Sequence, residues 1–231
     1  PPPPPPPPPP LFFPRSPRNP RCSGVSWARE MCIRDRYEPG SFTNAVGLTN
    51  PGVSRSAQLL AELSIPSNRF LLISIFGASI EEYVDVAKQL APHGDGLELN
   101  LSCPHAKGLG MAMGQDPALV EEIVSSVKAA VNVPVVAKLT PNVPDIGMIA
   151  EAAEKGGADA ICAINTMGPE QYDSHGFPIL SNKKGGVSGK GIMSAALEGV
   201  SRIREAVRCP IIACGGISGA NDVRHFLQSG A

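Results

Sequence analysis

The 231-residue sequence lacks several patterns that would indicate particular classes of protein. It has no long Lys or Arg run in its central part and a net charge of -1, so a nucleic-acid-binding surface is not expected. No apolar run approaches the ~18 residues that a membrane span needs. No CxxC pair occurs, which argues against a disulfide scaffold, a zinc site or an iron–sulfur cluster; the six cysteines are Cys22, Cys32, Cys103, Cys162, Cys209 and Cys214. These absences favour a small-molecule partner and a reducing, cytoplasmic compartment.

The first 36 residues differ in composition from the rest of the chain. They begin with ten consecutive prolines, which form only an extended polyproline II rod, and continue with Arg-rich sequence of no clear periodicity. We interpret residues 1–36 as a non-native or disordered leader and expect a single folded domain over 37–231.

From Tyr37 onward, apolar β patterns alternate with helical patterns, which is typical of βα units and a parallel sheet. The clearest helix has Asp116 as its N-cap and Pro117 at its first position, followed by a valine and isoleucine stripe to Val131. Residues 165–191 are predicted to form a long loop over the site. The expected strands are 70–76, 96–101, 133–139, 159–164 and 210–214, and the other helices 79–91, 145–155, 194–207 and 219–229.

Two segments of the chain repeat one another, since residues 130–137 and 206–213 are each a helix end that leads into a strand started by proline. Equivalent units at intervals favour a (β/α)8 TIM barrel over a doubly wound sheet. Counting along such a barrel, we expect the sequence to be incomplete at both ends, with strands 1, 2 and 8 missing.

The segment from Glu98 to His105 carries the strongest chemical signal. Leucines at 97, 99 and 101 alternate with Glu98, Asn100 and Ser102, as in a strand with one polar face. Cys103 follows directly, where parallel α/β folds place their chemistry. An unpaired buried polar group costs ~1–3 kcal/mol, so the polar face must meet a ligand or a partner. The other free cysteines are expected to be small buried hydrophobes: Cys22, Cys162, Cys209 and Cys214.

Lys138 ends the apolar strand pattern at 135–138, and a lysine directed into a barrel is unfavourable unless it meets an anion. The alternative is a lysine that reaches out to solvent at the barrel rim. Asn side chains at strand ends suit a ligand edge that alternates donors and acceptors. Two glycines, Gly215 and Gly216, follow the last strand and leave backbone N–H groups open to a phosphate.

The run from Asn44 to Ala231 resembles class 1 dihydroorotate dehydrogenase, in particular its 1B and archaeal forms. The resemblance rests on six motifs in the family's order, at residues 44–52, 98–104, 137–143, 164–166, 185–189 and 214–217. It implies an FMN-dependent TIM barrel that oxidises dihydroorotate to orotate in de novo pyrimidine (UMP) biosynthesis. It also implies a homo-oligomer and an iron–sulfur/FAD electron-transfer subunit as partner.

The resemblance further implies roles for individual residues. Cys103 would be the catalytic base, and Lys138 would stabilise negative charge on the flavin. The remaining substrate-binding residues would be Asn44, Val46, Gly47, Leu48, Asn100, His105, Asn165 and Thr166. The FMN-binding residues would be Ser74, Asn100, Lys138, Ile164, Gly189, Gly215 and Gly216.

One residue departs from the family's usual pattern, because His105 stands where an asparagine commonly touches the substrate. Histidine also occurs there in archaeal members of the family and in the pyrimidine-reducing domain of dihydropyrimidine dehydrogenase. Two alternatives therefore stay open at this point: a uracil- or thymine-reducing domain of that kind, and an inactive barrel fragment whose open sheet edges prevent closure.

Overall fold

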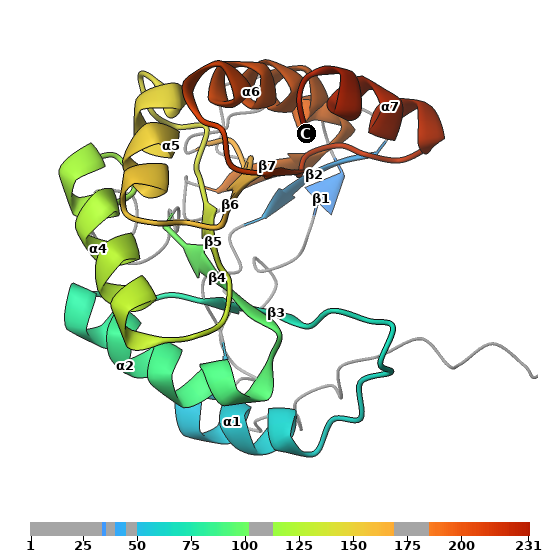
Figure 1. Cartoon of the computed structure of the whole chain (residues 1–231). Helices are drawn as coiled ribbons and strands as arrows, with labels where there is room; N and C mark the ends of the chain where they lie inside the picture. Colours follow the sequence, from blue (N-terminus) through green and yellow to red (C-terminus); the bar gives the residue numbers. More distant parts are fainter. Residues whose placement is uncertain (1–33, 36–39, 45–49, 102–112, 169–184) are drawn as a thin grey trace, which may run out of the picture.

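The computed structural model describes residues 34–35, 40–44, 50–101, 113–168 and 185–231 (Figure 1). Five strands form a parallel sheet in which each strand pairs with the next one along the sheet. In spatial order they are β3 (Leu72–Ile75), β4 (Gly96–Asn100), β5 (Val135–Lys138), β6 (Ala160–Ala163) and β8 (Ile211–Ala213). All five lie within the strands that the sequence predicts.

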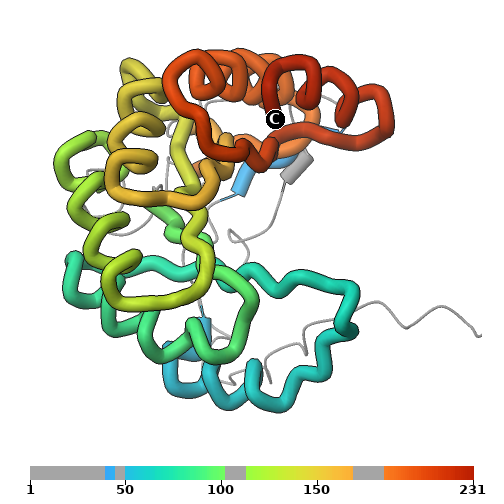
Figure 2. Tube along the Cα trace, viewed as in Figure 1, coloured from blue at the N-terminus to red at the C-terminus, as the bar shows by residue number. Residues whose placement is uncertain are grey.

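The helices lie in an arc around one side of this sheet (Figures 1 and 2). Those that the sequence predicts are α2 (Ile80–Leu90), α4 (Pro117–Ala130), α5 (Ile146–Lys155), α6 (Met193–Ala206) and α7 (Ala220–Gln228). Three helices lie outside the predicted ones: α1 (Val53–Ala61) and the short 3-10 helices η3 (Ala91–His93) and η4 (Lys190–Ile192). A parallel sheet with its helices outside it is the wall of a (β/α) barrel.

The start of α4 shows how local sequence fixes a helix. The Asp116 side chain accepts a hydrogen bond of 3.0 Å from the Ala118 N–H, and Pro117 occupies the first turn. Both features satisfy or remove N–H groups that would otherwise lack a partner. The predicted apolar stripe is fully buried at Val120, Ile123, Val124 and Val127.

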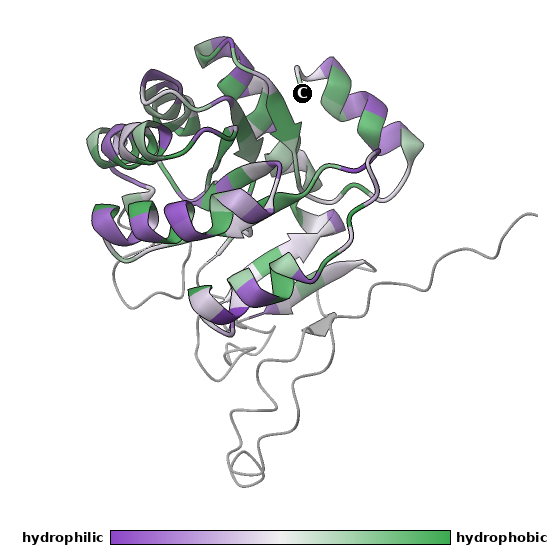
Figure 3. Cartoon of the chain, turned by 60° about the horizontal axis from the view of Figure 1, so that its bottom comes forward, coloured by the Kyte–Doolittle hydropathy of each residue, from purple (hydrophilic) through white to green (hydrophobic). Residues whose placement is uncertain are grey.

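The strands have two different faces. The outer face packs on the helices and is apolar, with Leu97, Leu99 and the following Leu101 fully buried there. The helices show both purple and green residues in Figure 3, as expected for elements with one buried side. The inner face has a small apolar cluster of Val136, Ala160, Cys162 and Leu72, beyond which polar residues follow toward the carboxyl ends of the strands.

A second, antiparallel sheet joins segments far apart in the chain. It consists of β1 (Arg34–Asp35), β2 (Ser41–Asn44) and β7 (Gly186–Gly189), in that order. The prediction of an unbroken loop over 165–191 is therefore wrong for β7 and for η4. The glycine-rich sequence of β7 has no alternating apolar pattern, and its strand conformation depends on pairing with the distant β2.

Acidic side chains brace the amino ends of the strands in a repeated arrangement. The Asp159 carboxylate accepts a 2.6 Å hydrogen bond from the Val135 N–H, and the Asp159 N–H donates to the Val135 carbonyl at 2.8 Å. Asp95 makes the same two bonds with Leu71, at 2.7 and 2.9 Å. Each aspartate thus fixes the start of its own strand against the start of the neighbouring strand.

Lys128 adds an ion pair to one of these braces, with its Nζ 2.8 Å from Asp159 Oδ2. Partial burial alone would raise the pKa of Asp159, but the bonds from Lys128 and the Val135 N–H outweigh it and lower this pKa below its usual value. A carboxylate whose pKa is lower in the folded state stabilises the fold above its unfolded pKa of ~3.9. That contribution is lost as the pH falls through the folded-state pKa.

We expect Asp159→Asn to lower the free energy of unfolding by ~1 kcal/mol at pH 7, a value discounted because solvent reaches this ion pair. The difference from the unmodified chain should shrink below pH ~4, where the carboxylate becomes protonated. Urea unfolding at pH 7 and at acidic pH measures both effects. The matched control is Glu151→Gln, which removes a half-exposed helical pair with Lys155 and should change stability little. Equal stability of Asp159→Asn and the unmodified chain at pH 7 would contradict the expectation.

Candidate active site

Polar side chains from three neighbouring strands meet on the inner face of the sheet. The Ser74 hydroxyl on β3 donates a 2.9 Å hydrogen bond to the Glu98 carboxylate on β4. The Lys138 ammonium on β5 lies 3.7 Å from the other Glu98 oxygen. Strand register explains the meeting, since Ser74 stands opposite Glu98, and Lys138 stands opposite Asn100, two residues farther along β4.

The Lys138 side chain is largely buried, with 16% of it exposed. Burial alone would lower the pKa of Lys138, but Cys162, Glu98 and Cys214 raise it, and the net direction is upward. Burial raises the pKa of the Cys162 thiol to about 12, so this group is neutral near pH 7. Among the described groups around Lys138, Glu98 is the carboxylate, and its Oε2 lies 3.7 Å from the ammonium nitrogen.

Two predicted pyrimidine-binding residues come together at the ends of β4 and β6. Asn165 Nδ2 donates to Asn100 Oδ1 at 3.2 Å, and the Asn165 side-chain oxygen accepts from the Thr166 N–H at 2.7 Å. The buried Tyr83 of α2 fixes the end of β4, because its hydroxyl donates to the Asn100 carbonyl at 2.9 Å. The structure thus brings these two predicted residues together at the carboxyl ends of their strands.

The loop after β5 is tied to the loop after β6 through Asn142. Its Nδ2 donates to the Thr140 hydroxyl at 3.0 Å and to the Thr166 carbonyl at 3.3 Å. Its Oδ1 accepts from the Gly168 N–H at 3.1 Å. Asn142 therefore fixes the backbone at Thr166 and Gly168, on either side of Met167. Thr166 directly follows Asn165.

The second sheet brings Asn44 to the same region. Asn44 Nδ2 donates to the Gly186 carbonyl at 3.5 Å, and the Thr166 side chain lies against Gly186 so closely that a Cβ there would collide with its hydroxyl. Reciprocal hydrogen bonds between the backbones of Met167 and Val187 join the loop after β6 to β7. Glycine at 186 is thus required for the close approach of Thr166.

Three predicted cofactor-binding glycines form a second cluster. Gly189 ends β7, and Gly215 and Gly216 follow β8, all with positive φ. A Cβ on Gly216 would lie 2.9 Å from the Gly189 carbonyl oxygen and 2.8 Å from Met193 Cβ. The backbones of two strand ends therefore approach one another only because no side chain intervenes.

Three residues differ from their expected surroundings. Cys214, expected to be a small buried hydrophobe, is exposed, because the edge strand β8 has no following strand over it among the described residues. Ile164 is 1% exposed, its side chain packs toward Gly199 of α6, and its N–H donates to the Cys214 carbonyl at 2.7 Å. Cys162 is buried as expected, whereas Cys209 is only half-buried. The predicted residues Cys103, His105, Val46, Gly47 and Leu48 lie outside the described residues.

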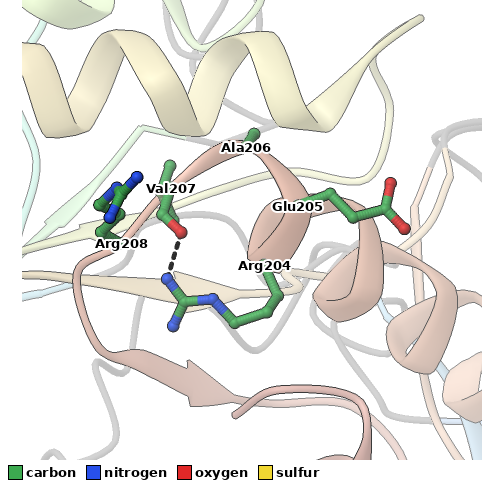
Figure 4. A pocket seen from close by; sticks show the side chains of 5 residues that line it. All are labelled: Arg204, Glu205, Ala206, Val207 and Arg208. Atoms are coloured by element: carbon green, nitrogen blue, oxygen red, sulfur yellow. Dashed lines mark hydrogen bonds between the residues drawn. The ribbon is translucent and has the colours of Figure 1, made fainter.

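A surface pocket lies elsewhere, at the end of α6 and before β8 (Figure 4). Arg204 donates a hydrogen bond to the Val207 carbonyl there, and Arg208 and Glu205 complete much of the lining. This segment leads into the amino end of β8, whereas the polar and glycine clusters lie toward the carboxyl ends of the strands. The pocket contains none of the predicted site residues.

The sequence model of the family described as dihydroorotate dehydrogenase matches residues 34–231. This match includes every described site residue. The chain belongs to the dihydroorotate dehydrogenase family. Members of this family depend on a flavin.

Archaeal relatives are similar over most of the chain. The catalytic subunit of dihydroorotate dehydrogenase B (NAD(+)) from Methanocella arvoryzae is 47% identical over 197 residues, which cover 85% of this chain and 64% of the relative. The protein of the same name from Pyrococcus horikoshii is 46% identical, with 84% of this chain and 63% of the relative covered. The chain thus spans less than two thirds of the length of these relatives.

Solved structures show the same fold. Two crystal structures of DHODH from Eimeria tenella, one in complex with ferulenol and one free of ligand, match with a TM-score of 0.68. Their sequences are 19% and 20% identical, and 83% of this chain and 60% and 62% of theirs are covered. The fold is a (β/α)8 barrel, of which the described strands form part, so the predicted fold class is confirmed. None of the described helices is both long and apolar enough to cross a membrane.

Two residues of the site carry no local signal that assigns them to it. In the sequence, Glu98 is part of a polar strand face and Asn142 is part of a motif. The alternation along β4 predicts that Glu98 shares a face with Asn100, but its partners follow from the register of β3 and β5. Nothing local predicts the bonds of Asn142, because they depend on how two loops meet.

We expect Asn142→Ala to lower the free energy of unfolding by ~1–2 kcal/mol, because the Thr166 carbonyl and the Gly168 N–H lose their partner. Amide hydrogen exchange at Gly168 should become faster, since opening of this loop would no longer break a hydrogen bond. Asn221→Ala is the matched control, because Asn221 only accepts a surface hydrogen bond from Arg224 on α7. Unchanged exchange at Gly168 in Asn142→Ala would show that Asn142 does not hold this loop.

Proposed function

We propose that this protein oxidises dihydroorotate to orotate with FMN as cofactor, in de novo pyrimidine biosynthesis. The observation that carries the proposal is the convergence of Lys138, Asn100 and Asn165 at the carboxyl ends of adjacent strands, in a chain of this family. Active sites of (β/α)8 barrels lie at this end of the strands.

The residues present fit an anionic flavin mononucleotide. Lys138 supplies a partly buried cation, and Ser74 and Asn100 lie on the same inner face with groups that bind polar ring edges. The backbones of Gly189, Gly215 and Gly216 come together where a side chain would fill the space, as a phosphate cradle requires. Ile164 completes the proposed set. When bound, FMN supplies a two-electron acceptor for hydride.

The roles of the chain's own residues follow from the reaction. Oxidation of dihydroorotate removes a proton from C5 and a hydride from C6, so a base must stand near C5. We assign the role of this base to Cys103, because the unperturbed pKa of a cysteine thiol, ~8.5, is close to the working pH. The pyrimidine edge alternates carbonyl acceptors with N–H donors, which neutral amides match. The proposed binding set is Asn44, Asn100, Asn165 and Thr166, with His105 and the backbones of Val46, Gly47 and Leu48.

The proposal extends to the assembly. The archaeal relatives are named catalytic subunits of NAD(+)-linked enzymes, which implies a further subunit in those proteins. We propose that this chain likewise passes electrons to an iron–sulfur/FAD subunit and forms a homo-oligomer in the cytoplasm. Co-purification with such a subunit and NAD-dependent turnover test this part.

We expect Cys103→Ser to slow single-turnover flavin reduction by dihydroorotate ~10²–10⁴-fold, the range for a lost general base, because serine is far less acidic. FMN should remain bound, so the visible flavin spectrum serves as an internal control. Cys209→Ser is the matched control and should react like the unmodified protein, since Cys209 precedes the amino end of β8. Stopped-flow absorbance makes the measurement, and near-normal reduction in Cys103→Ser would exclude this residue as the base.

The identity of the substrate is tested at His105. We expect faster flavin reduction with dihydroorotate than with dihydrouracil, because the C6 carboxylate needs a donor or cation that dihydrouracil does not require. His105→Ala should weaken dihydroorotate binding by ~1–3 kcal/mol, the cost of an unmade hydrogen bond to a charged group. A clear preference for dihydrouracil would favour a uracil- or thymine-reducing enzyme instead. Failure of the protein to bind FMN would favour an inactive fragment.

A further inference from the structure

Glu98 occupies an unusual place for a carboxylate, on the inner face of a barrel strand with 14% of its side chain exposed. Both of its oxygens have partners on neighbouring strands. One accepts the 2.9 Å bond from the Ser74 hydroxyl, and the other lies 3.7 Å from Lys138 Nζ. A buried carboxylate is unfavourable without such partners. The contacts with Ser74 and Lys138 therefore stabilise Glu98 in this position.

The pair also limits where the Lys138 ammonium lies. Lysine has a long, flexible side chain, and a lysine at a strand end otherwise extends toward solvent. Here Ser74 fixes Glu98 from β3, and Glu98 in turn faces Lys138 from β4. Among the residues that the structure describes, the titratable groups around Lys138 are Glu98, Cys162 and Cys214, and of these Cys162 is a neutral thiol near pH 7.

We propose that Glu98 is a positioning residue that acts through Lys138: it holds the ammonium group on the inner face and offsets part of its positive charge. The proposal rests on the proposed function, in which Lys138 stabilises negative charge on the bound flavin. With Glu98 in place, the cluster presents less positive charge to the cofactor than a lone lysine would. Glu98 therefore sets how strongly Lys138 favours the reduced flavin.

The replacement Glu98→Gln tests this idea, because it removes the charge and nearly preserves the shape. In the partly desolvated site, loss of the neighbouring anion should make protonation of Lys138 less favourable. The expected result is a fall of the Lys138 pKa by about one unit, which is a tenfold change in its protonation equilibrium. Lys138 should nevertheless remain protonated at pH 7.

This titration is measured on the full chain without added FMN, labelled with [6-13C]lysine, by following the Cε resonance against pH in NMR spectra. Lys138→Arg assigns the resonance. Glu151→Gln is the matched control, since it removes a carboxylate 3.1 Å from Lys155 in a pair that is at least half exposed, where solvent screens the charge. A Lys138 titration in Glu98→Gln that moves no more than that of Lys155 in the control overturns the proposal.

Two further variants keep the test decisive if Glu98→Gln does not fold. Glu98→Asp retains the charge but shortens the side chain, and should lower the Lys138 pKa by less than Glu98→Gln. Ser74→Ala removes the hydrogen bond to the Glu98 carboxylate and should also lower the pKa of Lys138. Absence of a shift in both folded variants overturns the proposal.

The second readout is the midpoint potential of bound FMN at pH 7. Loss of the Glu98 charge leaves the site more positive, so the FMN of Glu98→Gln should be easier to reduce. A tenfold change in the ratio of reduced to oxidised flavin corresponds to about +30 mV for a two-electron couple. An unchanged potential with FMN bound overturns the tuning role. Failure of the unmodified protein to bind FMN contradicts the proposed function instead, and the titration of Lys138 still decides whether Glu98 positions it.

Discussion

The alternation of side chains along the parallel strands is the constraint on which the rest of the structure depends. Because helices cover one face of the sheet, every apolar residue of that face is committed to the core, as Leu97, Leu99 and Leu101 show. The residues between them must then point to the inner face. Polar residues are placed there without disturbing the packing, so the core and the candidate site share the same strands but not the same side chains.

The inner face is divided between charged and neutral groups. Glu98 and Lys138, with the Ser74 hydroxyl bound to Glu98, form the charged part, and Asn100 and Asn165 form a neutral amide pair beside it. This division suits the chemistry proposed, because a flavin that gains negative charge needs a cation, whereas a neutral pyrimidine ring needs donors and acceptors without net charge. Cys162 belongs to the apolar cluster beneath them, and its buried thiol stays neutral.

The sequence predicted what depends on local signals. The cap at Asp116 and Pro117 and the alternation in β4 indicated elements that the structure confirms. β2 and β7 were missed because they stabilise each other across 142 residues, at Asn44 and Gly186. α1 was missed because its N-cap is a glycine without a side-chain hydrogen bond. In the site, Lys138 and the two amides were predicted, whereas the partners of Glu98 and Asn142 follow from strand register and loop contacts that no single segment encodes.

The aspartate braces at the amino ends of the strands have a consequence for how this fold varies. Asp95 and Asp159 each secure two neighbouring strands through bonds to backbone groups, so they impose little requirement on the side chains of the strands they hold. The residues that could bind ligands lie at the other end. Substitutions there can alter chemistry while the register of the sheet stays anchored from below. The barrel wall thus fixes strand register at one end of the strands, while residues at the other end can differ without loss of that register.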